Sequence, residues 1–225
     1  MTNIAANLQV LLDEINTETQ DPVMLVAVSK KQSALAIRHA YDCGQKDFGE
    51  NYVQELLDKQ EELKDLNINW HFIGHLQRNK AKYIVGKVHL IQGVDNPKLL
   101  QEIEKQASKQ HVQQKILLQV NVSGEESKSG CQDKDLFELI TKANACEHIT
   151  LCGLMTIGST AANEQTKQSE FTRLKNLFEE AKTQVKDPNC WTELSMGMSG
   201  DFKLAIKQGS TMVRVGTRIF GERDK

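Results

Sequence analysis

Short apolar runs alternate with amphipathic stretches along the chain. The clearest run spans residues 23–28, follows Asp21-Pro22 and ends at Ser29-Lys30. It is short and rich in β-branched residues, so it predicts a buried parallel strand rather than a helix. Similar runs predict seven further strands: 46–51 with its exit loop, 70–74, 88–92, 116–122, a stretch within 149–157, 190–196 and 212–215.

Helical spacing fills the intervals between these strands. Apolar residues at steps of three and four predict helices around 4–15, 34–41, 53–57, 99–103, 136–143, 171–185 and 202–206. Ser33, Asn96 and Ser199 are predicted to cap three of the helices, and Gly44 and Gly209 to end two of them.

Eight strands that alternate with helices imply parallel pairing. They predict an α/β fold, a (β/α)8 TIM barrel with an extra N-terminal helix, and an open doubly wound sheet is the alternative. The length of 225 residues suits one such barrel. With three prolines and no low-complexity linker, no domain boundary is indicated, so we expect a single domain over residues 1–225.

Composition excludes several classes of partner. The net charge of -2 predicts no footprint for nucleic acid or an anionic membrane. No apolar run approaches the ~18 residues of a membrane span, and the polar N-terminus shows no signal-peptide pattern. The five cysteines are scattered without a CxxC pair, so they predict neither a disulfide framework nor a zinc site. We expect a cytoplasmic protein in which Cys43 and Cys190 are packing residues.

Two charged residues lie where barrel strands place chemistry. Lys30 follows the carboxyl end of the first strand, where active sites of such folds form. It is interpreted as an ammonium that holds an anion, as a desolvated amine that reacts with an aldehyde, or as a solvent-exposed lysine. Arg214 lies between Val213 and Val215 and needs a partner, either a carboxylate inside the barrel or a ligand acceptor such as a ring nitrogen.

Glycine-rich loops follow the last two predicted strands. The loops at 196–200 and 216–217 occupy the positions where barrels commonly bind phosphate, because backbone N–H groups can approach an anion there. The alternative is an ordinary capping serine with ordinary turn glycines. Elsewhere, His71 is predicted to pack in the core and His75 to lie in a loop near the barrel mouth. Lys128 is predicted to be a solvated charge, with an anion-binding role as the alternative.

Seven motifs occur in an order that identifies a family. They are Val28-Ser29-Lys30, Phe48-Gly49-Glu50-Asn51-Tyr52, Trp70-His71-Phe72-Ile73-Gly74-His75-Leu76-Gln77, Ser127-Lys128-Ser129-Gly130, Gly153-Leu154-Met155-Thr156-Ile157, Leu194-Ser195-Met196-Gly197-Met198-Ser199 and Gly209-Ser210-Thr211-Met212-Val213-Arg214-Val215-Gly216-Thr217. Together they resemble the pyridoxal phosphate homeostasis proteins, which look like the barrel domain of bacterial alanine racemase. The resemblance covers nearly the whole chain.

This resemblance implies a cofactor and the residues that hold it. Pyridoxal 5′-phosphate would form an internal aldimine, a Schiff base, on Lys30, and Arg214 would face its pyridine nitrogen. Asn51 would lie beside the ring. The phosphate would be held by Ser195 or Ser199 of the seventh loop, with both serines open as the hydroxyl contact, and by Gly216 and Thr217. The site residues implied are Lys30, Asn51, Ser195, Ser199, Arg214, Gly216 and Thr217.

The implied function is intracellular homeostasis of vitamin B6, with an indirect effect on amino-acid and keto-acid metabolism. An arginine can donate to the ring nitrogen but cannot accept from it, so the ring would be a weak electron sink. Because the chain ends at Lys225, we expect no second catalytic domain and little or no catalysis. The alternatives are a slow pyridoxal-dependent amino-acid racemase and a metal or phosphosugar barrel enzyme. The expected partners are the cofactor and, transiently, pyridoxal-dependent apoenzymes, and the protein is expected to be a monomer.

Overall fold

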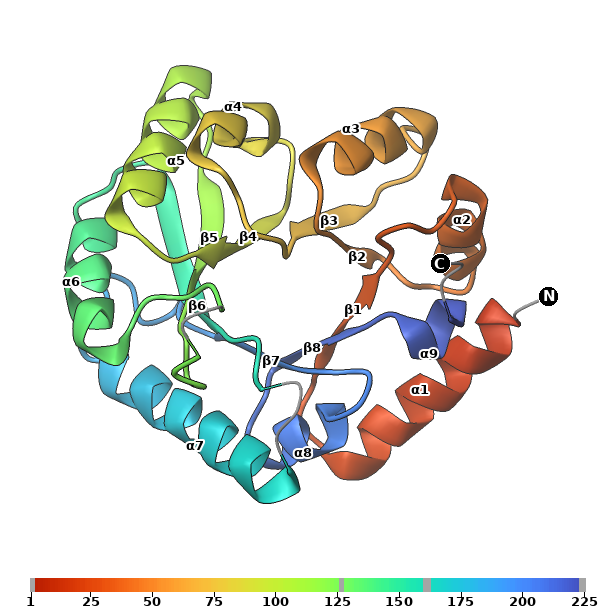
Figure 1. Ribbon diagram of the computed structural model, residues 1–225. Helices are drawn as coiled ribbons and strands as arrows, with labels where there is room; N and C mark the ends of the chain where they lie inside the picture. Colours follow the sequence, from red (N-terminus) through yellow and green to blue (C-terminus); the bar gives the residue numbers. More distant parts are fainter. Residues whose placement is uncertain (1–2, 126–127, 160–162, 223–225) are drawn as a thin grey trace.

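A closed barrel of eight parallel strands forms the centre of the protein in the computed structural model (Figure 1). The structure describes residues 3–125, 128–159 and 163–222, so Ser127 of the motif at 127–130 lies outside the described residues. The strands are β1 (Met24–Val28), β2 (Asp47–Glu50), β3 (Asn69–Phe72), β4 (Leu90–Val94), β5 (Gln114–Gln119), β6 (Ile149–Met155), β7 (Glu193–Met198) and β8 (Met212–Val215).

Helices surround this barrel and fill the intervals between its strands (Figure 1). They are α1 (Ile4–Glu18), α2 (Ala34–Asp42), α3 (Val53–Glu62), a 3-10 turn η1 (Arg78–Lys80), α4 (Ala81–Ile84), α5 (Pro97–Gln110), α6 (Asp133–Asn144), α7 (Glu164–Ala181), α8 (Phe202–Lys207) and α9 (Thr217–Phe220). None of the helices in the described ranges is long and apolar enough to span a membrane.

Pairing between the first and last strands closes the barrel. Met24 of β1 is in register with Met212 of β8, and Ala27 with Val215. This closure confirms the predicted (β/α)8 fold and excludes the open sheet. Helix α1 precedes β1, as predicted for the extra N-terminal helix, and contacts α8 and α9 on the outside of the barrel.

Several strand boundaries differ from the predicted ones. β4 is shifted towards its carboxyl end, β5 begins at Gln114 and ends at Gln119, and β7 begins at Glu193. β5 ends early because the next residues pair with the returning loop, where the Asn121 N–H donates to the Cys131 carbonyl at 3.0 Å. β7 begins late because the Trp191 indole is buried against the Phe178 ring of α7, with 5.1 Å between ring centroids.

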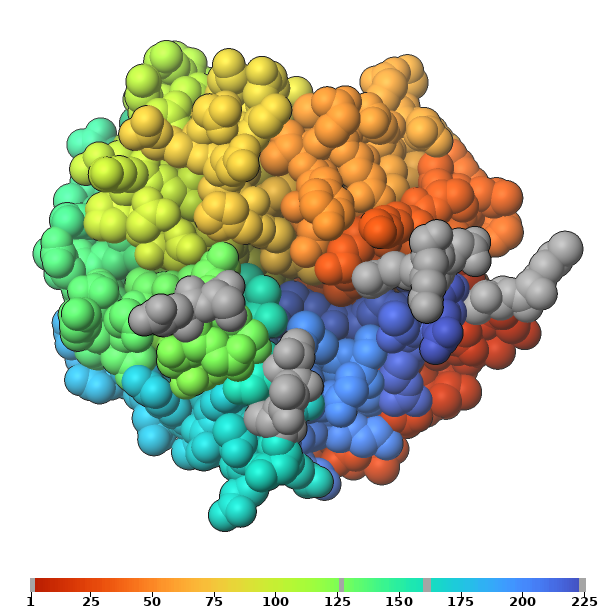
Figure 2. Space-filling view, viewed as in Figure 1, coloured from red at the N-terminus to blue at the C-terminus, as the bar shows by residue number. Residues whose placement is uncertain are grey.

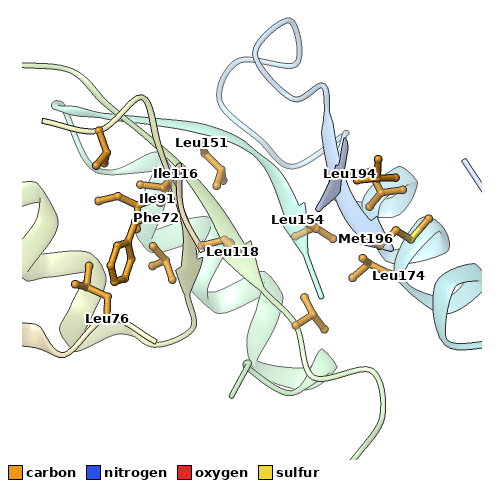
Figure 3. Close-up of a cluster of buried hydrophobic side chains, with 14 of the residues drawn as sticks. Phe72, Leu76, Ile91, Ile116, Leu118, Leu151, Leu154, Leu174, Leu194 and Met196 are labelled. Carbon is orange, nitrogen blue, oxygen red and sulfur yellow. The ribbon is translucent and has the colours of Figure 1, made fainter. Parts of the chain in front are cut away.

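Successive side chains of each strand point to opposite sides of the barrel wall, so the apolar side chains form two separate layers. The larger cluster lies between the strands and the helices, and Figure 3 shows part of it, with Leu154, Leu194 and Met196 of the strands near Leu174 of α7. A smaller cluster fills the barrel interior and consists of Val26, Leu90, Leu117, Cys152, Met155 and Met212. Burial of these side chains from many strands makes the barrel a packed core rather than a pore.

Ion pairs connect α1 to the two short helices at the end of the chain. Glu14 contacts the Arg218 guanidinium at 2.8 and 2.5 Å and Lys203 at 2.9 Å, and Glu18 lies 3.5 Å from Lys207. Figure 2 shows the consequence, since the red N-terminal residues and the blue C-terminal residues share one edge of the molecule. These contacts hold together segments that are about 200 positions apart in the chain.

We expect Glu14→Gln to destabilise the protein in a pH-dependent way. Hydrogen bonds from Arg218 and Lys203 lower the pKa of Glu14 from 4.5 to about 2. A lowered carboxyl pKa stabilises the fold above the unfolded value, and this contribution is lost as pH falls from 4.5 to about 2. Because the pair is partly exposed, the variant should lose about 1 kcal/mol of unfolding free energy at pH 7.

Urea unfolding at pH 7 and at acidic pH measures this difference, which should disappear once Glu14 is protonated. Glu61→Gln is the matched control, because the Glu61 and Lys64 side chains are 76% and 72% exposed and should contribute almost nothing. A loss that persists unchanged at low pH would show that the ionic contact is not its cause.

Candidate functional site

Lys30 lies on a tight turn that follows β1. The Ser29 carbonyl accepts a hydrogen bond from the Gln32 N–H at 2.9 Å, which closes the turn. Lys31 adopts a φ of +60°, a left-handed conformation that is uncommon outside glycine. The Lys30 side chain is partly buried at the carboxyl end of the barrel. The amine is therefore presented from a defined backbone rather than from a free loop.

A buried ion cluster holds this turn in place. Lys59 of α3 is 5% exposed, and its Nζ lies 2.7 Å from the Ser29 carbonyl, from Glu50 Oε1 and from Glu55 Oε1. Glu50 is fully buried, and its Oε1 also accepts from the Ser29 hydroxyl at 2.6 Å. Glu55 in turn accepts from the Lys31 N–H. The cluster connects α3 and β2 to the residues on both sides of Lys30.

Burial and charge act in opposite directions on Glu50. Burial raises the pKa of Glu50 above 4.5, and the Lys59 ammonium and the Ser29 hydroxyl only partly oppose this. Its second oxygen, Oε2, is buried without a hydrogen-bond partner in the described part of the chain. The carboxylate therefore depends on Lys59 for most of its compensation inside the protein.

Asn51 follows β2 and carries a second unpaired acceptor. Its Oδ1 is buried and has no hydrogen-bond partner among residues 3–125, 128–159 and 163–222. The adjacent backbone is packed closely, since a Cβ atom on Gly74 would lie 2.2 Å from the Asn51 carbonyl oxygen. Only glycine permits this approach of the loops after β2 and β3. An orphaned acceptor costs about 1–3 kcal/mol, so this amide suits a ligand with a polar group.

Arg214 lies inside the barrel and is 4% exposed. One terminal nitrogen donates to the Ser195 hydroxyl at 2.5 Å and the other to the Thr156 carbonyl at 2.7 Å. No ion pair among the described residues includes Arg214, so the predicted alternative of a structural pair with a carboxylate is wrong. Burial lowers the pKa of Arg214 to about 10, which leaves the guanidinium charged at neutral pH. The guanidinium N–H groups need hydrogen-bond acceptors, and the uncharged oxygens of Ser195 and Thr156 supply them.

A hydrogen bond connects the loops after β7 and β8. The Gly216 N–H donates to the Ser199 hydroxyl at 3.3 Å. The predicted capping role of Ser199 is wrong, because Asp201 occupies the N-cap position of α8. The Asp201 carboxylate accepts from the Met198 N–H at 2.7 Å and pairs with Lys167 at 3.2 Å. Neither α8 nor α9 has a side-chain cap, so their first turns present N–H groups that suit an anion.

The predicted residues gather on four neighbouring strands. β7, β8, β1 and β2 are consecutive in the closed barrel, and their carboxyl ends face the same mouth. The residues at or beyond these ends are Lys30, Asn51, Ser199, Gly216 and Thr217, and Arg214 points inward just below them. Ser195 lies deeper, fully buried, and donates its hydroxyl to Gln92 Oε1 at 2.7 Å. Its hydroxyl is therefore already shared between Gln92 and Arg214.

The predictions for the two histidines are confirmed. His71 is fully buried, with Nε2 3.0 Å from Asp47 Oδ1 and Nδ1 3.1 Å from Gln92 Nε2. His75 is exposed in the loop after β3. The two rings therefore belong to different environments.

The predictions for Lys128 and Cys43 are wrong. The Lys128 side chain is 16% exposed and donates to the Gly158 carbonyl at 2.8 Å, so it is not a solvated charge but connects the loops after β5 and β6. Cys43 is exposed beyond the end of α2 and does not pack. Cys190 is half-buried and donates to Asp187 at 3.1 Å, which raises the pKa of its thiol.

Sequence reasoning missed the residues that support the site. Glu50, Lys59, Gln92 and Thr156 are buried polar residues. Lys59 donates to Glu50 and to the Ser29 carbonyl beside Lys30, Gln92 accepts from the Ser195 hydroxyl, and the Thr156 backbone carbonyl accepts from Arg214. A signal existed for two of them. Gln92 interrupts an apolar run, and Glu55 and Lys59 have the i, i+4 spacing of a helical ion pair.

We expect Lys59→Met to cost about 3–5 kcal/mol of unfolding free energy, because it leaves Glu50 buried without a counter-charge. Since the pKa of Glu50 is already raised by burial, the loss should increase as pH rises above 4.5. Urea unfolding at pH 5 and pH 8 measures both effects. Adding Glu50→Gln should recover much of the loss, and a single variant as stable as the parent would contradict this role of the ion cluster.

Comparisons with known proteins show which proteins this chain resembles. The sequence profile of the alanine racemase N-terminal domain matches residues 1–224. A protein of Aquifex aeolicus named pyridoxal phosphate homeostasis protein is 44% identical over 199 residues, which cover 88% of this chain and 86% of that protein. The human protein of the same name is 42% identical over 212 residues, which cover 89% of this chain and 76% of the human one.

A solved structure is similar to this chain in its three-dimensional fold as well as in sequence. PipY of Synechococcus elongatus with bound pyridoxal phosphate has a TM-score of 0.88 and 36% identity, and the match covers 97% of this chain and all of PipY. With a family profile that spans almost the whole chain and relatives above 40% identity, this chain belongs to the pyridoxal phosphate homeostasis protein family, whose barrel is that of the alanine racemase N-terminal domain.

Proposed function

We propose that this protein binds pyridoxal 5′-phosphate through Lys30 and takes part in the intracellular homeostasis of vitamin B6, with indirect effects on amino-acid and keto-acid metabolism. The observation that carries the proposal is an amine on a rigid turn at the barrel mouth, in a chain related to PipY, whose structure holds pyridoxal phosphate. The relatives named as homeostasis proteins support the same role.

The reactive group in this proposal is the Lys30 amine. When bound, pyridoxal 5′-phosphate supplies an aldehyde that condenses with a primary amine, with loss of one water, to a product that absorbs visible light. The turn at Ser29 and the buried Lys59 contact hold the backbone that carries Lys30 at the carboxyl end of β1. Because the backbone on both sides is held, little ordering entropy is lost when the amine binds its partner.

Arg214 and Asn51 are the side chains that we assign to the pyridine ring of the cofactor. Arg214 stays charged and can only donate, so it pairs with an unprotonated ring nitrogen rather than a protonated one. The hydrogen bond from Arg214 to Ser195 uses the serine hydroxyl inside the barrel, so we assign Ser195 to orienting the arginine and leave Ser199 as the phosphate hydroxyl. Asn51 Oδ1, which has no hydrogen-bond partner in the described part of the chain, fits a polar substituent of the ring.

The phosphate is assigned to Ser199, Gly216 and Thr217. The Ser199 hydroxyl already meets the Gly216 N–H, so the two loops present donors at one point. The uncapped first turns of α8 and α9 add backbone N–H groups of the kind that bind anions.

We assign little or no catalysis to this site. A guanidinium that faces the ring nitrogen disfavours its protonation, because two positive groups would meet in a poorly solvated pocket. A slow amino-acid racemase is the alternative, and sustained turnover of any amino acid by the loaded protein would favour it.

The proposal also includes a cytoplasmic monomer that meets pyridoxal-dependent apoenzymes transiently. The five free thiols support the cytoplasm as the compartment.

We expect Lys30→Ala to abolish the visible absorption of the loaded protein and the mass gain on borohydride reduction. The reason is the loss of the only amine assigned to the aldehyde. Intact-mass and peptide mass spectrometry measure the adduct. Lys31→Gln is the matched control, since Lys31 is adjacent but exposed, and it should keep both signals. An unchanged adduct in Lys30→Ala would place the cofactor on another lysine.

We expect Ser199→Ala combined with Thr217→Ala to weaken cofactor retention while the covalent adduct still forms. Each change removes a charge-assisted hydrogen bond of roughly 1.5–3 kcal/mol, or about a ten- to hundredfold loss of affinity. Equilibrium dialysis measures the affinity. Thr141→Ala combined with Ser169→Ala, on exposed faces of α6 and α7, should leave it unchanged. Equal retention in the first double variant would place the phosphate elsewhere.

A further inference from the structure

A continuous chain of hydrogen bonds crosses the barrel interior. Arg214 donates to Ser195 Oγ at 2.5 Å, and Ser195 Oγ lies 2.7 Å from Gln92 Oε1. Gln92 Nε2 lies 3.1 Å from His71 Nδ1, and His71 Nε2 lies 3.0 Å from Asp47 Oδ1. These five residues come from five different strands, β8, β7, β4, β3 and β2. We call this set the interior chain.

The interior chain connects the two ends of the barrel. Its middle members, Ser195, Gln92 and His71, are fully buried, and Arg214 at one end is 4% exposed. At the other end, Asp47 is the first residue of β2, and His71 borders a cavity of about 230 Å³ at the amino-terminal mouth. The chain therefore runs from the mouth assigned to the cofactor to the opposite one.

The direction of each hydrogen bond in the interior chain follows from Arg214, because a guanidinium can only donate. Ser195 accepts from Arg214 and donates its own proton to the Gln92 carbonyl oxygen. The Gln92 amide then donates to His71 Nδ1, which leaves the His71 proton on Nε2, directed at Asp47. All donors thus point from Arg214 towards Asp47, and His71 is the neutral Nε2–H tautomer.

The opposite orientation of the Gln92 amide breaks this pattern. Its NH2 group would then face the Ser195 oxygen, so the Ser195 proton would lose Gln92 as its acceptor, and the Gln92 carbonyl would face His71 Nδ1. It would also lose the contact from Nε2 to Met212 Sδ, which is 3.1 Å long. Only the first orientation gives every donor an acceptor, and buried polar groups meet this requirement almost without exception.

The groups that face His71 agree with a proton on Nε2 that is donated to Asp47. Asp47 faces it from β2, the His89 ring lies 5.5 Å away between centroids, and Lys115 of β5 lines the same cavity. Burial raises the pKa of Asp47, but the contacts with His71 outweigh it, so the net pKa is lowered and the carboxylate is an acceptor at neutral pH.

We propose that Gln92 and His71 are positioning residues for Arg214. They hold the Ser195 hydroxyl in the direction that lets it accept from the guanidinium, and so aim the remaining guanidinium N–H groups at the cofactor's ring nitrogen. This inference rests on the proposed function, because it assigns Arg214 to that nitrogen. Gln92 and His71 themselves touch neither the cofactor nor Lys30 in this assignment.

The first measurement does not involve the cofactor. Nitrogen-15 NMR of the imidazole in the protein without cofactor reports which ring nitrogen of His71 carries the proton. The interior chain requires Nε2–H at neutral pH. A proton on Nδ1 would mean that Gln92 does not donate to His71, and it would overturn the inference whatever the protein binds.

The second measurement compares two ligands. Affinities are determined for pyridoxal 5′-phosphate and for its 1-deaza analogue, in which C–H replaces the ring nitrogen. The parent should prefer the natural cofactor by about tenfold, the worth of one charged hydrogen bond. Gln92→Met should lower this preference towards one, because the guanidinium is no longer held, while the affinity for the analogue changes little.

Gln114→Leu is the matched control. Gln114 is 1% exposed, but its amide bonds only to backbone groups, Gly86 N–H at 2.9 Å and the Val88 and Lys115 carbonyls. Gln114→Leu should destabilise the protein as Gln92→Met does. It should leave unchanged the preference for the natural cofactor over the 1-deaza analogue. If Gln92→Met does not fold, His71→Phe provides the same test by removing the acceptor at Nδ1.

The outcomes separate the two proposals. A parent that binds neither ligand would overturn the proposed function. A parent that prefers the natural cofactor, with a Gln92→Met variant that keeps the full preference, would overturn the positioning role while the proposed function stands. Loss of preference in Gln92→Met and its retention in Gln114→Leu would support both.

Discussion

A charged guanidinium inside a closed barrel imposes the main constraint on this protein. Arg214 is 4% exposed, and desolvation of such a group is costly unless oxygens replace water. The barrel provides a serine hydroxyl from β7 and a carbonyl that follows β6, and both lie within 2.7 Å of the guanidinium. Because the serine in turn needs an acceptor, polar residues extend into β4 and β3. The polar interior of the barrel follows from this single arginine.

A second buried charge organises the neighbouring part of the mouth, at β1 and β2. The Lys59 side chain of α3 donates to Glu50 and to the Ser29 carbonyl, so the turn that bears Lys30 is attached to a helix that α2 and β2 separate from it in the chain. In both clusters a charge lies in a low-dielectric site and is surrounded by fixed hydrogen-bond acceptors. Fixed acceptors restrict motion, and the residues at the barrel mouth are held in consequence.

Family membership and function rest on different observations. An alanine racemase of Bartonella henselae shares the barrel, with a TM-score of 0.74, at only 16% identity, and that likeness shows the fold alone. The same barrel supports different chemistry in its relatives, so function has to be argued from the site. The candidate site proposed here consists of an amine after β1, a buried arginine of β8 and the loops after β7 and β8, all on three adjacent strands.

The sequence alone determined the eight strands, the extra N-terminal helix and the positions of Lys30 and Arg214, because apolar period and chain order are local properties. It also indicated the caps at Ser33 and Asn96, which accept from Ala36 and Leu99. Tertiary structure decided what the buried polar groups contact. Ser199 meets Gly216 across two loops instead of capping α8, Lys128 is held by Gly158, and Arg214 meets hydroxyl and carbonyl oxygens rather than a carboxylate. These partners lie 17 to 58 positions apart in the chain, and no local pattern records which strands the closure of the barrel brings face to face.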